Sequence, residues 1–217
     1  TVKPYYYSVY LADYDVTAEI TPTERASIFR FKFPENKNSY LIIDAFDKGS
    51  YIKIIKGANK IVGYSTRNSG GVAPNFKNYF VVQLDKPFAD GAVWSDTSIV
   101  KNSIELQANH VGAALRFETK KGEVVHARVA SSFISLEQAE LNLKELGNES
   151  FDQVCQKGRA IWNKGLSSIL VEGGTSDQQK TFYSCLYRTM LFPRKFFEMD
   201  AAGKVFQAHG RFEANRQ

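Results

Sequence analysis

The first 134 residues alternate between apolar and polar positions with the two-residue period of β-strands. In "SIFRFKF", Phe29, Phe31 and Phe33 fall on one face, while Ile28 and Lys32 fall on the other. Similar short runs follow: "SYLIIDAF", "YIKIIKG", "KIVGYS", "NYFVVQL", "AALRFET" and "VVHARVASSF". Turn-forming stretches such as "FPENKN", "DKGS" and "KKGE" separate them. Many short strands without helical segments between them predict an antiparallel β-sandwich.

The period changes to that of helices at Ser135. Three segments each begin with a serine followed three residues later by a glutamine, the sequence of a capping box. The expected pairs are Ser135 with Gln138, Ser150 with Gln153, and Ser176 with Gln179. Gly147 predicts the end of the first helix and Pro193 the end of the third. Strands followed by helices predict two domains, over residues 1–134 and 135–217.

The third helical segment has an apolar stripe formed by Phe182, Cys185, Leu186, Thr189 and Met190. Additional aromatic residues make it apolar nearly all round, which predicts a helix buried inside a larger assembly. "FFEMDAAGKVFQAHG" then predicts a hairpin or loop. By its period Trp162 belongs to a core, and Cys155 and Cys185 are expected to be small buried residues, with a disulfide between them left open.

Composition narrows the class of protein. Of 217 residues 43% are apolar, enough for a substantial core, and the formal net charge is +5. The basic residues are scattered among acidic ones, so no stripe for nucleic acid is formed. No run of 18 apolar residues predicts a transmembrane helix, and no signal peptide is visible. We therefore expect neither a nucleic-acid partner nor a transmembrane segment.

Three residues are candidates for ligand binding. Trp94 lies between polar residues in "FADGAVWSDTS", where it could stack on a sugar ring, although a single Trp belongs more often to a core. Asn109 and His110 interrupt a strand pattern in "ELQANHVGAALRF", either as part of a site or as a surface turn. Arg67, in the polar loop 64–75, could bind an anion or a sugar hydroxyl. No complete catalytic set and no zinc spacing is present.

Several long stretches resemble the N-terminal part of glycoside hydrolase family 92, the α-mannosidases common in glycan-foraging Bacteroidetes. They are "YYSVYLADYDVTAEITPTERASIFRFKFP", "GYSTRNSGGVAPNFKNYFVV", "RVASSFISLEQAELNL" and "VEGGTSDQQKTFYSCLYRTMLFPRKFFEMD". The resemblance runs from about Tyr5 to Lys204. It implies a mainly β fold, in which a galactose-mutarotase-like supersandwich is followed by linker helices and the start of an (α/α)6 catalytic barrel. The third helix would be an early helix of that barrel.

The resemblance also implies a reaction, the calcium-dependent, inverting hydrolysis of α-linked, most commonly α-1,2-linked, mannose. A glutamic acid would protonate the leaving oxygen and an aspartate would activate water. These carboxylates and the calcium ligands are expected in the barrel beyond this chain, so no catalytic or metal residue is assigned. The sandwich is expected to contribute Trp94, Asn109 and His110 to the mannose pocket.

The expected partners are mannose-containing glycans and the C-terminal barrel, and the expected location is the periplasm, the cell surface or the medium. We expect the fragment alone to be inactive. Two alternatives are a non-catalytic mannose-binding module and a structural domain that seats the barrel, which would expose an apolar patch around Phe182, Leu186 and Phe196.

Overall fold

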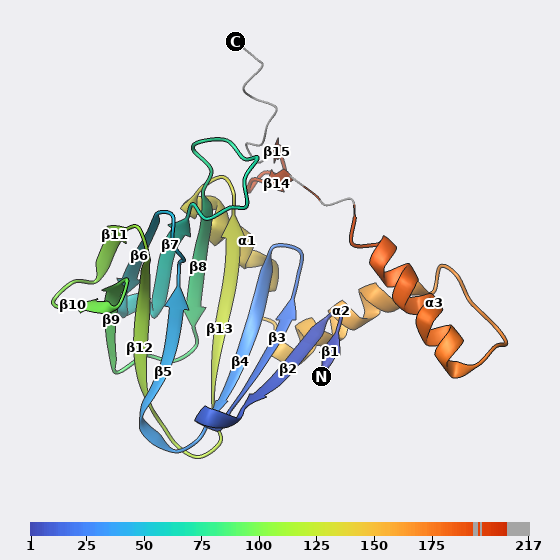
Figure 1. The fold of residues 1–217 in the computed structure, drawn as a ribbon, viewed down its shortest axis with the longest axis horizontal. Coiled ribbons are helices and arrows are strands. Elements are labelled where there is room, and N and C mark those ends of the chain that lie inside the picture. The colour runs from blue at the N-terminus through green and yellow to red at the C-terminus, as the bar shows by residue number, and fades with distance from the viewer. Residues whose placement is uncertain (193–194, 196, 208–217) are drawn as a thin grey trace, which may run out of the picture.

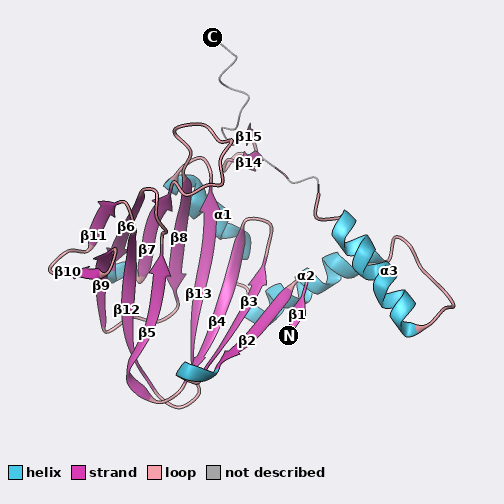
Figure 2. Cartoon of the chain, viewed as in Figure 1, coloured by secondary structure: helices cyan, strands magenta, loops and turns pink. Residues whose placement is uncertain are grey.

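A computed structural model describes residues 1–192, 195 and 197–207 of the chain, and strands dominate it (Figure 2). The strands are β1 (Val2–Lys3), β2 (Tyr6–Leu11), β3 (Val16–Pro22), β4 (Ala26–Phe33), β5 (Asn36–Asp44), β6 (Ser50–Ile55), β7 (Lys60–Ser65), β8 (Asn78–Leu84), β9 (Asp90–Ser95), β10 (Ser98–Val100), β11 (Glu105–Ala108), β12 (Val111–Thr119), β13 (Glu123–Ser132), β14 (Phe197–Met199) and β15 (Val205–Gln207). Short 3-10 turns are η1 (Ala12–Tyr14), η2 (Lys56–Ala58) and η3 (Lys144–Leu146).

The strands form two packed antiparallel sheets and a separate hairpin. The larger sheet has nine strands in the order β1-β2-β3-β4-β13-β8-β7-β6-β11, and the smaller has four in the order β10-β9-β12-β5. The last long strand, β13, lies in the middle of the larger sheet, between β4 and β8. Figure 1 shows the smaller sheet in front of the larger one. The predicted antiparallel β-sandwich is therefore confirmed.

The space between the sheets is filled by side chains from alternate positions of facing strands. Ile52 and Ile54 of β6 meet Val111 and Leu115 of β12, and all four are at most 1% exposed. Phe33 is buried in the same core, with Phe29 and Phe31 packed beside it, as the alternation in β4 predicts. Burial of these side chains is the main stabilising contribution in such a sandwich.

Helices cover the other face of the larger sheet. The three helices of the chain are α1 (Leu136–Leu143), α2 (Phe151–Leu166) and α3 (Ser176–Thr189), and those on this face are α1 and the first half of α2. Ile28 and Val81 of the sheet pack there with Ala139 of α1, Leu146 of η3 and Phe151 of α2 in a second buried core. The second half of α2 and all of α3 project away from the sandwich (Figure 1). No helix in the described part of the chain has the length and apolar character needed to span a bilayer.

The helix starts agree with the sequence at two positions and differ at the third. Ser150 and Gln153 form the complete capping box of α2. Ser135 caps α1, but the Gln138 side chain does not return to it. It donates instead to Asn142 Oδ1 at 3.1 Å and to the carbonyl of Met199 at 2.8 Å. The Gln138 amide thus joins a long-range contact in place of a local cap.

The expected cap of α3 is wrong by one residue. Its capping box is formed by Thr175 and Gln178, not by Ser176 and Gln179. The run "TSDQQ" contains two overlapping Thr/Ser-x-x-Gln frames, and both satisfy the same rule. The backbone decides between them: Gly174 takes the left-handed region with φ 70°, and Thr175 then becomes the extended cap residue.

The expected burial of the cysteines is not found within the described residues, and the burial of α3 inside a larger assembly stays a prediction. No residue of α3 is buried, Cys185 is exposed, and Cys155 is half-buried. Both thiols are free, so there is no disulfide between them. Trp162 is half-buried and packs against Tyr187 of α3, with ring centroids 5.0 Å apart. Phe196, expected in an exposed apolar patch, lies outside the described residues.

The β14–β15 hairpin is held to α1 and to the end of β13 by one buried carboxylate. Glu198, 5% exposed, accepts hydrogen bonds from the backbone N–H of Phe133 at 2.9 Å and from Asn142 Nδ2 at 2.7 Å. Arg25 adds a hydrogen bond to the carbonyl of Phe197 at 2.8 Å. The hairpin predicted after the third helix is thus present and anchored on the sandwich.

Candidate functional site

One end of the sandwich gathers polar loops with aromatic side chains. Two connections meet there, the loop 45–49 between β5 and β6 and the loop 66–77 between β7 and β8. The backbone N–H of Thr66 donates to the carbonyl of Gly49 at 2.9 Å, which ties the loops together. The loop between β7 and β8 rises at the top of Figure 1, beside the β14–β15 hairpin. We refer to this region as the loop end.

Trp94 and His110 lie side by side at the loop end, on the outer face of the smaller sheet. Their ring centroids are 5.1 Å apart with the planes at 71°, an edge-to-face contact. His110 Nε2 lies 2.8 Å from Asp44 Oδ1, so the carboxylate holds the imidazole beside the indole. The pairing of β9, β12 and β5 places Trp94, Gly112 and Asp44 in one row across the sheet. Residues distant in sequence thereby form one cluster.

Gly112 permits this arrangement because it has no side chain. A Cβ built at Gly112 would lie 2.2 Å from Trp94 Cζ2 and 2.5 Å from the carbonyl oxygen of Ile43. The indole therefore lies against the backbone of β12, where any larger residue would displace it. Its orientation is set by the sheet, and this leaves a half-buried aromatic surface next to the hydrogen-bonded pair of His110 and Asp44.

Asn109 lies in the same region, and its side chain is exposed. Asn109 is connected to the 45–49 loop through its backbone. Its carbonyl accepts a hydrogen bond from the N–H of Gly49 at 2.8 Å. The structure thus brings Trp94 and His110 together, and it links Asn109 to the 45–49 loop. A role of these three residues in sugar binding stays a prediction.

The sequence patterns did not identify Asp44 and Phe46 as residues of a site. Asp44 Oδ1, which bonds His110, also accepts the backbone N–H of Phe46 at 2.7 Å. The ring of Phe46 is 53% exposed. The Arg67 guanidinium carbon lies 5.7 Å from the centre of that ring, and Arg67 forms an ion pair with Asp47. No local motif marks these residues, because long-range contacts assemble them.

This set of groups is suited to binding a polyhydroxylated ligand rather than to covalent chemistry. Aromatic rings can pack on apolar C–H faces, while imidazole, carboxylate and guanidinium groups exchange hydrogen bonds with hydroxyls. Among the described residues there is no group of three or more His, Cys, Asp or Glu side chains that could hold a metal ion. These residues therefore do not fit a calcium site, and none is assigned.

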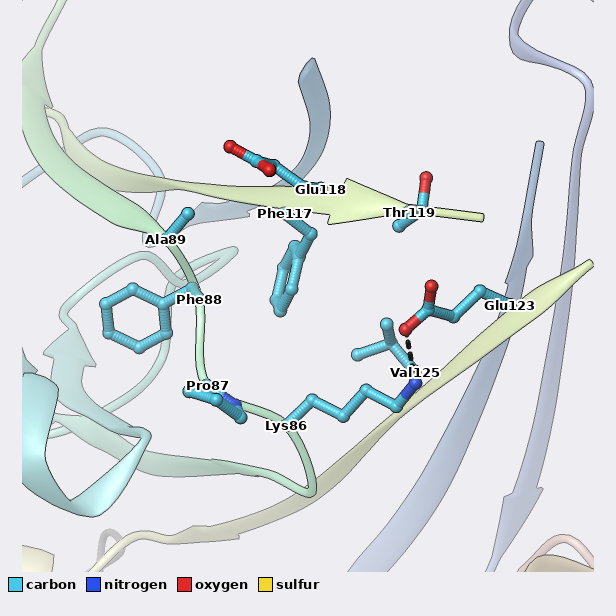
Figure 3. Close-up of a pocket in the computed structure, with 9 residues that line it drawn as sticks. All are labelled: Lys86, Pro87, Phe88, Ala89, Phe117, Glu118, Thr119, Glu123 and Val125. Carbon is cyan, nitrogen blue, oxygen red and sulfur yellow. Dashed lines mark hydrogen bonds and ion pairs between the residues drawn. The ribbon is translucent and has the colours of Figure 1, made fainter. Parts of the chain in front are cut away.

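The opposite end of the sandwich contains a hollow of about 340 Å³ (Figure 3). It is lined by Lys86, Pro87, Phe88, Ala89, Phe117, Glu118, Thr119, Glu123 and Val125. Lys86 and Glu123 form an ion pair across it, and the hydrogen bond from Lys86 is the main cause that lowers the pKa of the Glu123 carboxyl. The Thr119 hydroxyl donates to the carbonyl of Pro34 at 2.7 Å. These polar groups of the hollow are thus already paired within the protein.

Comparison with known proteins places the chain in a family. Residues 1–132 match the model of the glycosyl hydrolase family 92 N-terminal domain, and residues 138–216 match that of the family's catalytic domain. An uncharacterized secreted glycosidase of Arthroderma benhamiae is 27% identical over 226 residues, which cover 89% of this chain and 29% of that protein.

Two solved structures from Bacteroides thetaiotaomicron are also similar. An inverting mannosidase of family GH92 shares 36% identity, with a TM-score of 0.90 over 94% of this chain and 28% of its own. A GH92 α-mannosidase in complex with mannoimidazole shares 28% identity, with a TM-score of 0.82 over 96% of this chain and 29% of its own. The chain thus spans less than a third of the length of these relatives. Because the N-terminal family model alone matches more than half of its residues, the chain belongs to glycosyl hydrolase family 92.

Proposed function

We propose that this chain is the N-terminal portion of an exported α-mannosidase that removes α-1,2-linked mannose from glycans by calcium-dependent inverting hydrolysis. The observation that carries the proposal is the match over 94% of the chain, at 36% identity, to a GH92 inverting mannosidase. The complex of a second relative with mannoimidazole supports mannose as the sugar. The secreted glycosidase among the relatives supports a location outside the cytoplasm.

In this proposal the chain supplies part of the sugar pocket and the support for the catalytic barrel. Trp94, His110 and Asn109 contact the sugar at the loop end. The acid, the base and the calcium ligands belong to the rest of the full polypeptide, in which this chain is followed by the barrel. Calcium would coordinate sugar hydroxyls and stabilise charge there. The chain's own residues orient the glycan and exclude water around it.

The test compares this chain with the full polypeptide on α-1,2-mannobiose. We expect the full polypeptide to release mannose of inverted anomeric configuration, and to lose this activity when calcium is chelated. We expect no turnover by the 217-residue chain. Turnover by the chain in calcium buffer would contradict the assignment of the catalytic residues to the barrel, and failure of the full polypeptide on every α-mannoside would contradict the function.

A second candidate function is a non-catalytic module that binds mannose or only seats the barrel. The exposed aromatic residues at the loop end favour binding, and the uncovered α3 helix favours seating. Retention of the chain on a mannan column, reduced by Trp94→Ala, would support the binding module. If the chain is not retained on mannan but binds a hydrophobic dye through the patch around Phe182 and Leu186, the result would support a module that only supports the barrel.

A further inference from the structure

The loop 45–49 holds bulky residues in a backbone conformation that usually requires glycine. Phe46 has φ 62° and Lys48 has φ 72°, both in the left-handed region, and Gly49 follows at φ 104°. A left-handed phenylalanine is a genuine outlier, because its Cβ crowds the backbone. Such strain persists only where the surroundings enforce it, and it concentrates at functional sites.

The surroundings of the loop do enforce it. The N–H of Phe46 donates to Asp44 Oδ1 at 2.7 Å, and the carbonyl of Phe46 accepts from Ser50 Oγ at 2.8 Å. The hydroxyl of Thr66, from the loop between β7 and β8, shares its one hydrogen between the carbonyls of Lys48 and Gly49. The loop is therefore fixed at both ends and from the side. A glycine at position 46 would relieve the strain but remove the ring.

The strained residue presents its ring to solvent instead of burying it. Phe46 is 53% exposed, and Arg67, which is paired with Asp47, lies 5.7 Å from the ring centre. A cation near one face of an aromatic ring restrains the ring and leaves the other face available. Through Asp44 the same loop is bonded to His110 and thus to the Trp94 cluster.

We infer that Phe46 is a sugar-stacking residue, positioned by the strained 45–49 loop. Its ring packs on the apolar C–H face of a pyranose in the glycan, and the Arg67–Asp47 pair exchanges hydrogen bonds with the hydroxyls of that sugar. The inference deepens the proposed function and rests on it for the identity of the sugar. It explains why an exposed phenylalanine occupies a position where glycine would be more stable.

The experiment separates the ring from the strain, using the full polypeptide and a non-hydrolysable, sulfur-linked α-1,2-mannobiose as the probe. Phe46→Gly removes both the strain and the ring, Lys48→Gly removes equivalent strain two residues away, and Phe46→Tyr restores a ring. We expect both glycine variants to melt at higher temperature than the wild type. We expect the dissociation constant to rise about tenfold in Phe46→Gly alone, the scale of one aromatic contact.

Three results would overturn the inference. If Phe46→Gly binds the probe as tightly as the wild type, the ring does not contact the sugar. If Phe46→Gly melts at lower temperature in the full polypeptide, the ring packs against protein instead. If Lys48→Gly loses as much affinity for the probe as Phe46→Gly, the weaker binding results from the changed loop geometry and not from the missing ring.

Failure of the stacking inference can be told apart from failure of the proposed function. Wild-type hydrolysis of α-1,2-mannobiose tests the function without reference to Phe46. If sulfur-linked glucose or galactose disaccharides bind in place of mannobiose, and Phe46→Gly weakens them, the stacking role stands and the mannose assignment falls. Absence of binding to all of these probes overturns the stacking role.

Discussion

Helices α1 and α3 begin with the same kind of cap but have opposite surroundings. Ala139 of α1 is fully buried against the larger sheet, whereas no residue of α3 is buried. Phe182 and Leu186 on the stripe of α3 are only half-buried. Caps and periodicity determine where a helix forms, but most of its stability comes from packing of its apolar face. Helices docked on the sheet, α1 and the first half of α2, should therefore respond differently from α3 to matched substitutions.

The largest difference is expected for a pair of phenylalanines. Phe151 of α2, 3% exposed, packs against Tyr6 and Arg30, whereas Phe182 lies half-buried on α3. Phe151→Ala should lower the free energy of unfolding by about 3–5 kcal/mol. Phe182→Ala in the same 217-residue chain should lower it by less than about 1 kcal/mol. Urea unfolding measures both, and equal losses would contradict the contrast.

A smaller effect is expected where the hairpin meets α1. Glu198→Ala leaves the N–H of Phe133 and the Asn142 amide without their acceptor, at a cost of about 1–3 kcal/mol in the free energy of unfolding. Glu198→Gln retains one acceptor oxygen and the shape, and should lose less. Hydrogen exchange of the Phe133 amide measures the local effect. Unchanged exchange in Glu198→Ala would show that this carboxylate does not anchor the hairpin.

The two complete capping boxes provide a third test. Replacing a cap residue by alanine costs about 1 kcal/mol of helix stability. Ser150→Ala should lower the free energy of unfolding of the whole chain, because α2 is docked on the sheet through Phe151. Thr175→Ala should mainly unravel α3, seen as reduced helical circular dichroism with an unchanged global transition. The contrast fails if both variants shift that transition equally.

The smallest effect concerns pH and the ion pairs that attach α2. The hydrogen bond from Arg30 is the main cause that lowers the pKa of Glu19, and Arg30 also bonds Asp152 of α2 at 3.0 Å. A carboxyl whose pKa is lower in the folded chain than in the unfolded chain stabilises the fold at a pH above its unfolded pKa. This stabilisation is lost as the pH falls through the folded pKa. Stability should therefore decline below about pH 4.5, the ordinary Glu range, and less steeply in Glu19→Gln. Acid titration of the melting temperature measures this slope, and identical slopes would exclude Glu19.

Much of the fold follows from local patterns, and the prediction errs where two local frames overlap or where a distant residue takes a side chain away from its local partner. The alternation in "SIFRFKF" gave the correct faces of β4. The predicted cap of α3 is one residue too late because two overlapping Thr/Ser-x-x-Gln sequences fit the capping-box rule. The predicted capping box of α1 is incomplete because the Gln138 side chain bonds the β14–β15 hairpin instead of Ser135. The predicted boundary near residue 134 stays a prediction.

The site was predictable only in part, for the same physical reason. Trp94 and His110 were recognisable as an isolated aromatic and a polar interruption, and strand pairing brings them together. Asp44 and Phe46 were not recognised as site residues, because their contacts in the site come from other segments: Asp44 bonds His110, and Phe46 lies near Arg67. Local sequence identifies residue types suited to a ligand, but non-local hydrogen bonds decide which of them meet.

The central position of β13 has a consequence for how the chain folds during synthesis. Strands β1–β4 and β6–β8 are made early, but they share no direct pairing and are joined only through β13, which ends at Ser132. Until the ribosome has released that strand, the two halves present open edges at β4 and β8, which can pair with other chains. We therefore expect nascent chains that stall before Ser132 to aggregate, and we expect the non-local pairing of β13 with β4 and β8 to limit the folding rate.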